Sequence, residues 1–226
     1  MERFWEIDFF RGLAVLMMVA FHFLYDLNYF AVTSIPVNEG YLFWFARITA
    51  GIFIFISGIC LSVSYSKKKD KYWKKSLRRF TKLFGLGLII TAITWLFFPQ
   101  EFIVFGILHF FGLSAVIILP FLRFKKSNII LGLIFIAIGI FLSGIAFDFP
   151  YLLWLGLEPV GFLTFDYFPI FPWFGLLLIG LFAGKKFYVN KTPKIRNNVL
   201  TFIGRHSLLI YFLHQPVLIG IIFLLN

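Results

Sequence analysis

Long apolar runs separated by short polar segments dominate the chain. A helix needs about 20 consecutive apolar residues to cross the roughly 30 Å hydrocarbon core of a bilayer, and runs of about this length recur along the whole sequence. The pattern predicts an all-α transmembrane bundle of about seven spans, forming a single domain over residues 1–226. The predicted spans are residues 7–30, 41–65, 80–98, 102–122, 128–147, 170–187 and 204–225.

The segment 148–169 breaks this pattern. It is rich in aromatic residues, is interrupted by Pro150 and Pro159, and carries Asp148, Glu158 and Asp166. Irregular backbone that faces lipid is not tolerated at membrane depth, because its polar groups would have no partners. We therefore expect an interfacial or re-entrant loop that packs on protein or lies at the membrane surface.

The loops between the runs differ sharply in charge. Segment 66–82 holds nine Lys and Arg residues, and segments 123–128 and 185–205 are also basic. The alternate segments 31–40, 99–101 and 148–169 have no Lys or Arg but do contain acidic residues. Basic loops remain in the cytoplasm, so the sequence predicts a plasma-membrane protein with a cytoplasmic N-terminus and an extracytoplasmic C-terminus.

Composition supports a membrane protein and argues against several other classes. The chain is 61% hydrophobic and 14% charged, whereas a soluble domain is about 25% charged. Its net charge of +11 lies mostly between the apolar runs, which favours anionic lipid headgroups over nucleic acid as the partner. With one cysteine, Cys60, and scattered histidines, we expect no disulfide and no metal site.

The first predicted span carries four ionisable residues on one side. By the 3.6-residue helical period, Asp8, Arg11, His22 and Asp26 share a face about 60° wide and span roughly 27 Å along the axis. His22 and Asp26 are four residues apart and can touch, which makes His22 a candidate general base oriented by Asp26. The alternative is a buried pair that only ties helices together.

The residues at the cytoplasmic end of this polar face also have two interpretations. Asp8 and Arg11 lie one turn apart near the cytoplasmic face, and Gly12, which follows them, permits close approach of another helix. The pair is either part of a functional site or a salt bridge that anchors the helix at the interface.

Three further polar residues lie within predicted spans. Arg47 shares a helix face with Gly51 and Gly58, so we expect it to turn inward, to pair with Asp26 or to stabilise an oxyanion. The alternative is that it extends to the outer interface. His109 and His214 also lie within spans, and each alone is typical of a hydrogen-bonded interior histidine.

Five segments resemble a known family. ERFWEIDFFRGLAVLMMVAFHFLYD is similar to the opening of the membrane acyltransferases related to heparan-alpha-glucosaminide N-acetyltransferase, a motif shared with the wider acyltransferase-3 group. Four later segments resemble other motifs of the family: FIFISGICLS, FGILHFFGLS, DYFPIFPWFGLLLIG and IGRHSLLIYFLHQPVLIG. Segment 27–40 lacks the histidine that animal members carry after the first helix.

The resemblance implies transfer of an acyl group, typically acetyl, from cytoplasmic acyl-CoA to a hydroxyl or amine of a sugar-containing acceptor outside. His22 would take the acceptor's proton, Asp26 would orient it, and Arg47 or His109 would stabilise the oxyanion. Acyl-CoA would be bound by residues drawn from Asp8, Arg11, Arg78, Arg79, Arg205, His206 and His214. The identity of the acceptor and the oligomeric state stay open.

Two other classes of membrane protein remain as alternatives. A small transporter or flippase also needs polar groups at the membrane midplane, but the chain shows no internal repeat. In a non-catalytic membrane scaffold the charges within the spans would be dispensable.

Overall fold

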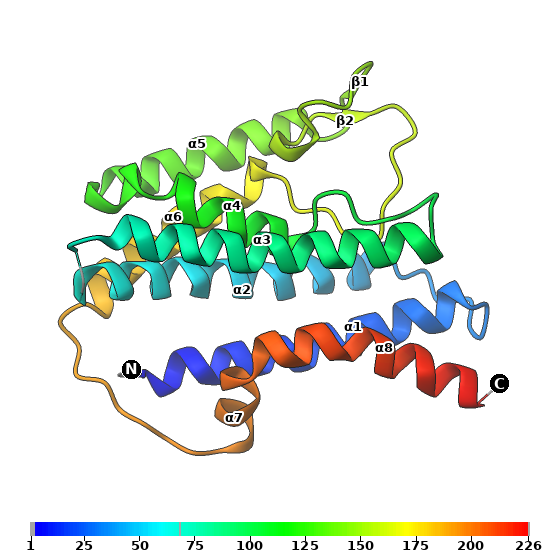
Figure 1. The fold of residues 1–226 in the computed structure, drawn as a ribbon, viewed down its shortest axis with the longest axis horizontal. Helices are drawn as coiled ribbons and strands as arrows, with labels where there is room; N and C mark the ends of the chain where they lie inside the picture. The colour runs from blue at the N-terminus through cyan, green and yellow to red at the C-terminus, as the bar shows by residue number, and fades with distance from the viewer. Residues whose placement is uncertain (1–2, 68, 226) are drawn as a thin grey trace. The chain divides into compact units, whose positions relative to one another are not determined.

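The computed structural model describes residues 3–67 and 69–225. Within them the fold is helical (Figure 1). Five of the described helices are long and apolar enough to cross a membrane, while α4 and α5 are apolar but shorter. The helices are α1 (Trp5–Tyr29), α2 (Gly40–Lys67), α3 (Tyr72–Phe97), α4 (Ile107–Ile117), α5 (Ser127–Leu142), α6 (Ile170–Phe187), α7 (Val199–Arg205) and α8 (Ser207–Leu225).

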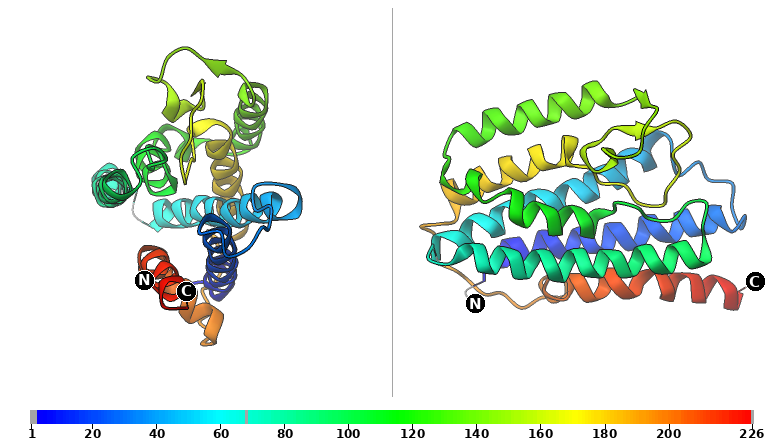
Figure 2. Two further views of the ribbon diagram at one scale, coloured as in Figure 1. Left: turned by 90° about the vertical axis from the view of Figure 1, so that its right-hand side faces the viewer. Right: turned by 45° about the horizontal axis from the view of Figure 1, so that its top comes forward.

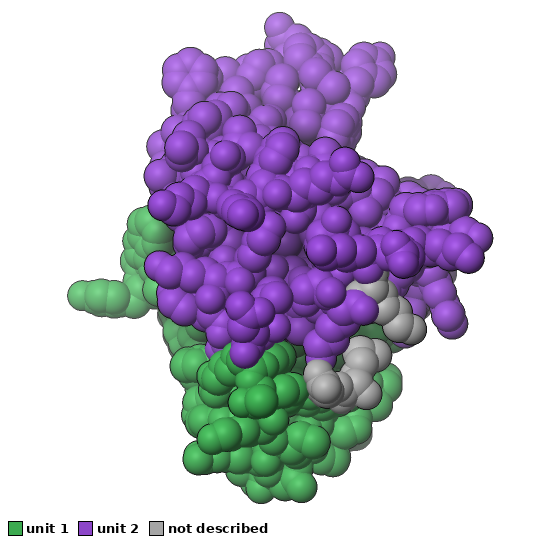
Figure 3. Space-filling view, turned by 90° about the vertical axis from the view of Figure 1, so that its left-hand side faces the viewer, with its two compact units in different colours: residues 1–56, 191–226 green, residues 57–190 purple. Residues whose placement is uncertain are grey.

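Contacts divide the chain into two compact units, which are coloured separately in Figure 3. Unit 1 comprises residues 1–56 and 191–226, and it holds α1, α7 and α8. Unit 2 comprises residues 57–190 and holds α3, α4, α5 and α6. The boundary falls within α2, so each unit includes part of that helix.

In unit 1, α1 packs against α7 and α8 (Figure 2). Two glycines make the α1–α7 crossing possible. A Cβ atom on Gly12 would collide with the carbonyl of Leu200, and one on Gly204 would collide with the carbonyl of Asp8. The two backbones therefore touch directly, the kind of contact that small residues permit between membrane helices.

The span predicted at 204–225 is interrupted in the structure. Helix α7 starts earlier, at Val199, because the Asn198 side chain accepts a hydrogen bond from Thr201 N–H at 2.8 Å and caps the helix. It ends at Arg205, and His206 has non-helical backbone angles before α8 begins. The apolar pattern alone did not reveal this short, separate helix.

In unit 2, α3 pairs with α4 and α5 pairs with α6. A Cβ atom on Gly132 of α5 would meet the carbonyl of Gly175 of α6, and the reverse also holds. Beside this crossing the rings of Phe121, Phe135 and Phe174 pack together, with centroids 5.4–6.4 Å apart.

The helix predicted over 102–122 spans only Ile107–Ile117, so the prediction was wrong for its first five and its last five residues. Residues 102–106 are irregular, and side chains satisfy their backbone groups. Thr91 Oγ1 donates to Ile103 O, Thr94 Oγ1 accepts from Ile103 N–H, and Thr164 Oγ1 donates to Phe102 O. This is the protein cover that non-helical backbone needs at membrane depth.

Two other predicted boundaries also shift. The helix predicted over 80–98 begins at Tyr72. The hydropathy pattern missed its first turns because they are basic and not apolar. The helix predicted over 128–147 ends at Leu142. The segment after it contains a 3₁₀ turn and a two-residue parallel strand pair, β1 (Ala146–Phe147) with β2 (Glu158–Pro159), a small exception to the all-α prediction.

Within unit 2 the helices alternate in direction, and their connections separate by charge. The end of α2, the start of α3, the α4–α5 connection and the end of α6 lie together, on the left in Figure 1. These are the basic segments of the unit. The connections at the opposite end, residues 98–106 and 143–169, contain acidic residues and no Lys or Arg.

Candidate active site

A buried carboxylate joins α1 to α7 in unit 1. Asp8 is 4% exposed, and its oxygens lie 3.0 Å from Arg11 Nη1, 3.5 Å from Arg205 Nε and 3.8 Å from Arg3 Nη1. Gly12, next to Arg11, supplies the close helix contact. The Asp-x-x-Arg-Gly sequence of the first helix thus builds an ion-pair cluster across a glycine crossing.

This geometry limits what the two arginines can bind. Arg205 also donates to Asn197 Oδ1 at 2.9 Å and to Arg196 O at 3.0 Å, so protein groups already engage its guanidinium. Arg11 bonds Asp8 and reaches Gly204 O at 3.4 Å. The cluster is consistent with the anchoring alternative for Asp8 and Arg11. His206, exposed at the end of α7, lies beside it in sequence.

Further along α1, His22 faces His214 of α8. Their ring centroids are 4.8 Å apart. His22 Nδ1 lies 2.9 Å from Met18 O, and His214 Nδ1 lies 2.6 Å from Tyr211 O. A carbonyl can only accept, so both Nδ1 atoms carry the proton and both Nε2 atoms hold a lone pair. Each imidazole therefore presents a basic nitrogen.

The contact expected between His22 and Asp26 does not form. Asp26 Oδ1 accepts instead from Gln215 Nε2 at 2.8 Å, while the Nδ1–H of His22 is committed to the carbonyl one turn back on its own helix. Two side chains four residues apart can meet, but here each has a better-placed partner. Asp26 thus links α1 to α8 next to His214, and Met18 O sets the tautomer of His22.

Arg47 is exposed on α2, and its guanidinium carbon lies 4.4 Å above the centroid of the Phe43 ring. This position fits the alternative in which the side chain extends toward the outer interface. It belongs to unit 1, like His22.

In unit 2, His109 is almost completely buried in the first turn of α4, with 2% of its surface exposed. Its Nδ1 accepts a hydrogen bond from Gly106 N–H at 3.3 Å. Its ring stacks on Phe105 and meets the edge of Phe84. His109 Nε2 has no hydrogen-bond partner among the described residues.

Asp166, which is not among the site residues predicted from the sequence, lies beside this turn. Its Oδ2 accepts from Ile107 N–H at 2.9 Å, and its carboxylate occupies the space in which Gly106 would carry a side chain. The available signal was an acid in an apolar segment just before α6.

The remaining candidates for acyl-CoA binding lie at the basic end of unit 2. Arg78 is exposed on the first turns of α3. Arg79, its neighbour, donates to Ser57 Oγ at 3.4 Å. Lys75 Nζ donates to Ser64 Oγ at 2.5 Å, again between α3 and α2. Lys75, Arg78 and Arg79 thus lie together on the first turns of α3, and cations of this kind are suited to binding phosphate groups.

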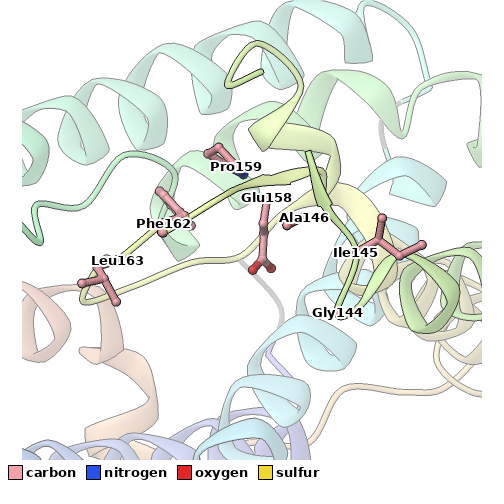
Figure 4. Close-up of a pocket in the computed structure, with 8 residues that line it drawn as sticks. Gly144, Ile145, Ala146, Glu158, Pro159, Phe162 and Leu163 are labelled. Carbon is pink, nitrogen blue, oxygen red and sulfur yellow. The ribbon is translucent and has the colours of Figure 1, made fainter. Parts of the chain in front are cut away.

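The 143–169 segment also forms a shallow pocket of about 330 Å³ at the acidic end of unit 2 (Figure 4). Glu158 carries the single charged side chain among its lining residues, which are Gly144, Ile145, Ala146, Glu158, Pro159, Gly161, Phe162 and Leu163. The Phe162 ring packs on Tyr167, the residue after Asp166, with centroids 5.2 Å apart.

Comparison with known proteins identifies the family. Residues 3–216 match the sequence model described as "Heparan-alpha-glucosaminide N-acetyltransferase, catalytic". No curated protein and no solved structure matches the chain. The family match covers nearly all of the 226 residues and includes both His22 and His214. The chain therefore belongs to the heparan-alpha-glucosaminide N-acetyltransferase catalytic family, a family of membrane acetyltransferases.

Proposed function

We propose that the protein transfers an acetyl group from cytoplasmic acetyl-CoA to a hydroxyl or amine of a sugar-containing acceptor on the outer side of the plasma membrane. The observation that carries the proposal is the state of His22. Its Nδ1–H is held by Met18 O, so its Nε2 lone pair is available as a base within an apolar helix. Membership of an acetyltransferase family supports this chemistry.

The reaction assigned to this base is a direct transfer. The acceptor oxygen or nitrogen attacks the thioester carbonyl carbon while His22 Nε2 takes its proton. The oxyanion that forms is stabilised by a hydrogen-bond donor, for which His109 and Arg47 are the candidates. The C–S bond then breaks, and His22 returns the proton to the CoA thiolate, which leaves as the thiol.

Turnover of radiolabelled acetyl-CoA by the purified protein tests the proposal, with amino sugars, neutral sugars and cell-envelope extracts as acceptors. Covalent label on an acceptor is the expected result. A transporter or flippase would move substrates without forming such a product. Acetyl-CoA at 100 times its Kd should also add about 2.7 kcal/mol of stability. Absence of both effects with every acceptor would exclude the proposed function.

Binding of the CoA phosphates is assigned to Arg78 and Arg79, on the first turns of α3 at the basic end of unit 2. Arg78→Ala with Arg79→Ala is expected to raise the KM for acetyl-CoA about tenfold or more, because a charge-assisted hydrogen bond contributes about 1.5–3 kcal/mol. Turnover at saturation should stay unchanged. The matched control, Lys125→Ala with Lys126→Ala, removes the same charge from another basic segment. A KM for acetyl-CoA unchanged from the wild type in a correctly inserted Arg78→Ala, Arg79→Ala variant would mean that these arginines only set topology.

We also propose seven spans, with α4 and α5 crossing together with the irregular segments that continue them. The N-terminus is then cytoplasmic and the C-terminus extracytoplasmic, as the separation of basic and acidic connections within unit 2 supports. A reporter fused after the last residue should read extracytoplasmic. A cytoplasmic signal there would mean that the number of spans is even, and the proposal of seven would be wrong.

A further inference from the structure

The first turn of α4 contains a buried hydrogen-bond donor without a partner. His109 Nδ1 accepts from Gly106 N–H, so in the neutral ring the proton is on Nε2. That Nε2 is buried and unpaired among the described residues. Buried polar groups are nearly always hydrogen-bonded, and an exception needs an explanation. A ligand oxygen that accepts this hydrogen bond would supply one.

Packing fixes the ring that carries this donor. A Cβ atom on Gly87 of α3 would lie 2.9 Å from His109 Cε1 and 3.0 Å from both ring nitrogens. Phe84 and Phe105 contact the same ring, with centroids 5.0 and 5.7 Å away. The imidazole lies against the bare backbone of Gly87 and has little room to rotate.

Asp166 holds the backbone at Gly106 and Ile107, and this backbone determines which ring nitrogen of His109 carries the proton. Its Oδ2 accepts from Ile107 N–H at 2.9 Å and fills the space in front of Gly106. Gly106 N–H is the group that occupies His109 Nδ1. The hydrogen bond of Tyr167 O–H to Leu153 O at 2.7 Å holds the segment that carries Asp166.

We propose that Asp166 is a positioning residue: through the first turn of α4 it holds His109 as a neutral imidazole whose Nε2–H is reserved for a carbonyl oxygen of the ligand. Resting on the proposed function, that oxygen is the acetyl carbonyl, on which negative charge develops during transfer. This tautomer is the opposite of the one in His22, where the proton is on Nδ1 and Nε2 holds the lone pair.

Nitrogen NMR of the full chain in detergent tests this assignment, with the imidazole nitrogens isotopically labelled. The chain has four histidines, and the signals that disappear in His109→Gln identify His109. The wild type should show a single neutral form with the proton on Nε2. Asp166→Asn should keep it, because an amide oxygen still accepts from Ile107 N–H. Asp166→Ala should yield a mixture of tautomers, and the control Asp148→Ala, at an exposed acid of the same segment, should not.

Turnover provides a second readout. Asp166→Ala should lower kcat by about 10–100-fold, the size of effect that loss of a supporting hydrogen bond has around metal-bound histidines. Asp166→Asn should keep most of the wild-type kcat. The KM for acetyl-CoA should be unchanged in both variants. If wild-type His109 carries its proton on Nδ1, the proposal is wrong, whether or not the Asp166 variants fold. It is equally wrong if Asp166→Ala leaves both tautomer and kcat as in the wild type. Failure of the proposed function would appear separately, as no turnover in the wild type.

Discussion

Replacing His22 with alanine is expected to lower kcat by about 10²–10⁴-fold, the usual contribution of a general base. The affinity for acetyl-CoA should be unchanged, because His22 does not lie among the basic residues assigned to the phosphates. Turnover and thermal stabilisation by acetyl-CoA, measured on the same preparation, separate the two effects. The matched control is Leu16→Ala, which removes a 46% exposed side chain from the same helix.

Asp26→Asn should cost much less than His22→Ala. The asparagine oxygen can still accept from Gln215, as Oδ1 of Asp26 does at 2.8 Å, and His22 takes its tautomer from Met18 O. If His22→Ala inserts and folds but keeps kcat within about threefold of the wild type, far below the expected loss, then His22 is structural. His214, whose Nε2 also holds a lone pair and has no partner among the described residues, would then be the leading base.

Gly204→Ala is expected to destabilise the protein by at least about 1–3 kcal/mol, the usual cost of overpacking. The added Cβ would meet three backbone atoms: the carbonyl oxygen and carbon of Asp8 and the nitrogen of Gly12. Backbone on both sides cannot rotate away, so α7 would have to separate from α1. The Asp8 ion-pair cluster, built across this crossing, would then weaken as well.

Gly220→Ala is the matched control, because a Cβ on Gly220 of α8 has no atom within 4 Å. There the substitution should be neutral or stabilising by up to about 1 kcal/mol, the difference between alanine and glycine in a helix. Thermal unfolding in detergent, followed by circular dichroism, compares the two variants. Equal melting temperatures would show that the α1–α7 contact is looser than the structure indicates.

The sequence predicted most of the helices because lipid imposes a simple rule on them. A run of apolar residues must be helical to satisfy its backbone, and charge decides which end is basic. The rule fails where backbone groups find other partners. Before α4, threonine side chains take the place of helical hydrogen bonds: those of Thr91, Thr94 and Thr164. The hydrophobic period of residues 102–106 cannot predict bonds to side chains outside that segment.

The candidate site was predictable to a similar extent. The polar face of α1 is a local property, so helical geometry alone selected His22 and Asp8. The partners of the two acids on this face lie almost two hundred residues away in sequence: Asp8 meets Arg205 of α7, and Asp26 meets Gln215 of α8. Asp166 escaped notice for the same reason. It reaches the start of a helix 59 residues before it, and nothing in its own segment indicates that partner.

The short length of α4 also sets a distance for the proposed reaction. Its 11 residues extend about 16 Å, roughly half of a 30 Å hydrocarbon core. The last turn of α4 lies at the basic end of unit 2, and the first turn points away from that end. With the basic end at the cytoplasmic membrane surface, as proposed, His109 in the first turn of α4 would lie near mid-depth rather than at the outer surface. A donor thioester entering from the basic end would need to reach only halfway into the membrane, and the acceptor would come down to meet it from the other side.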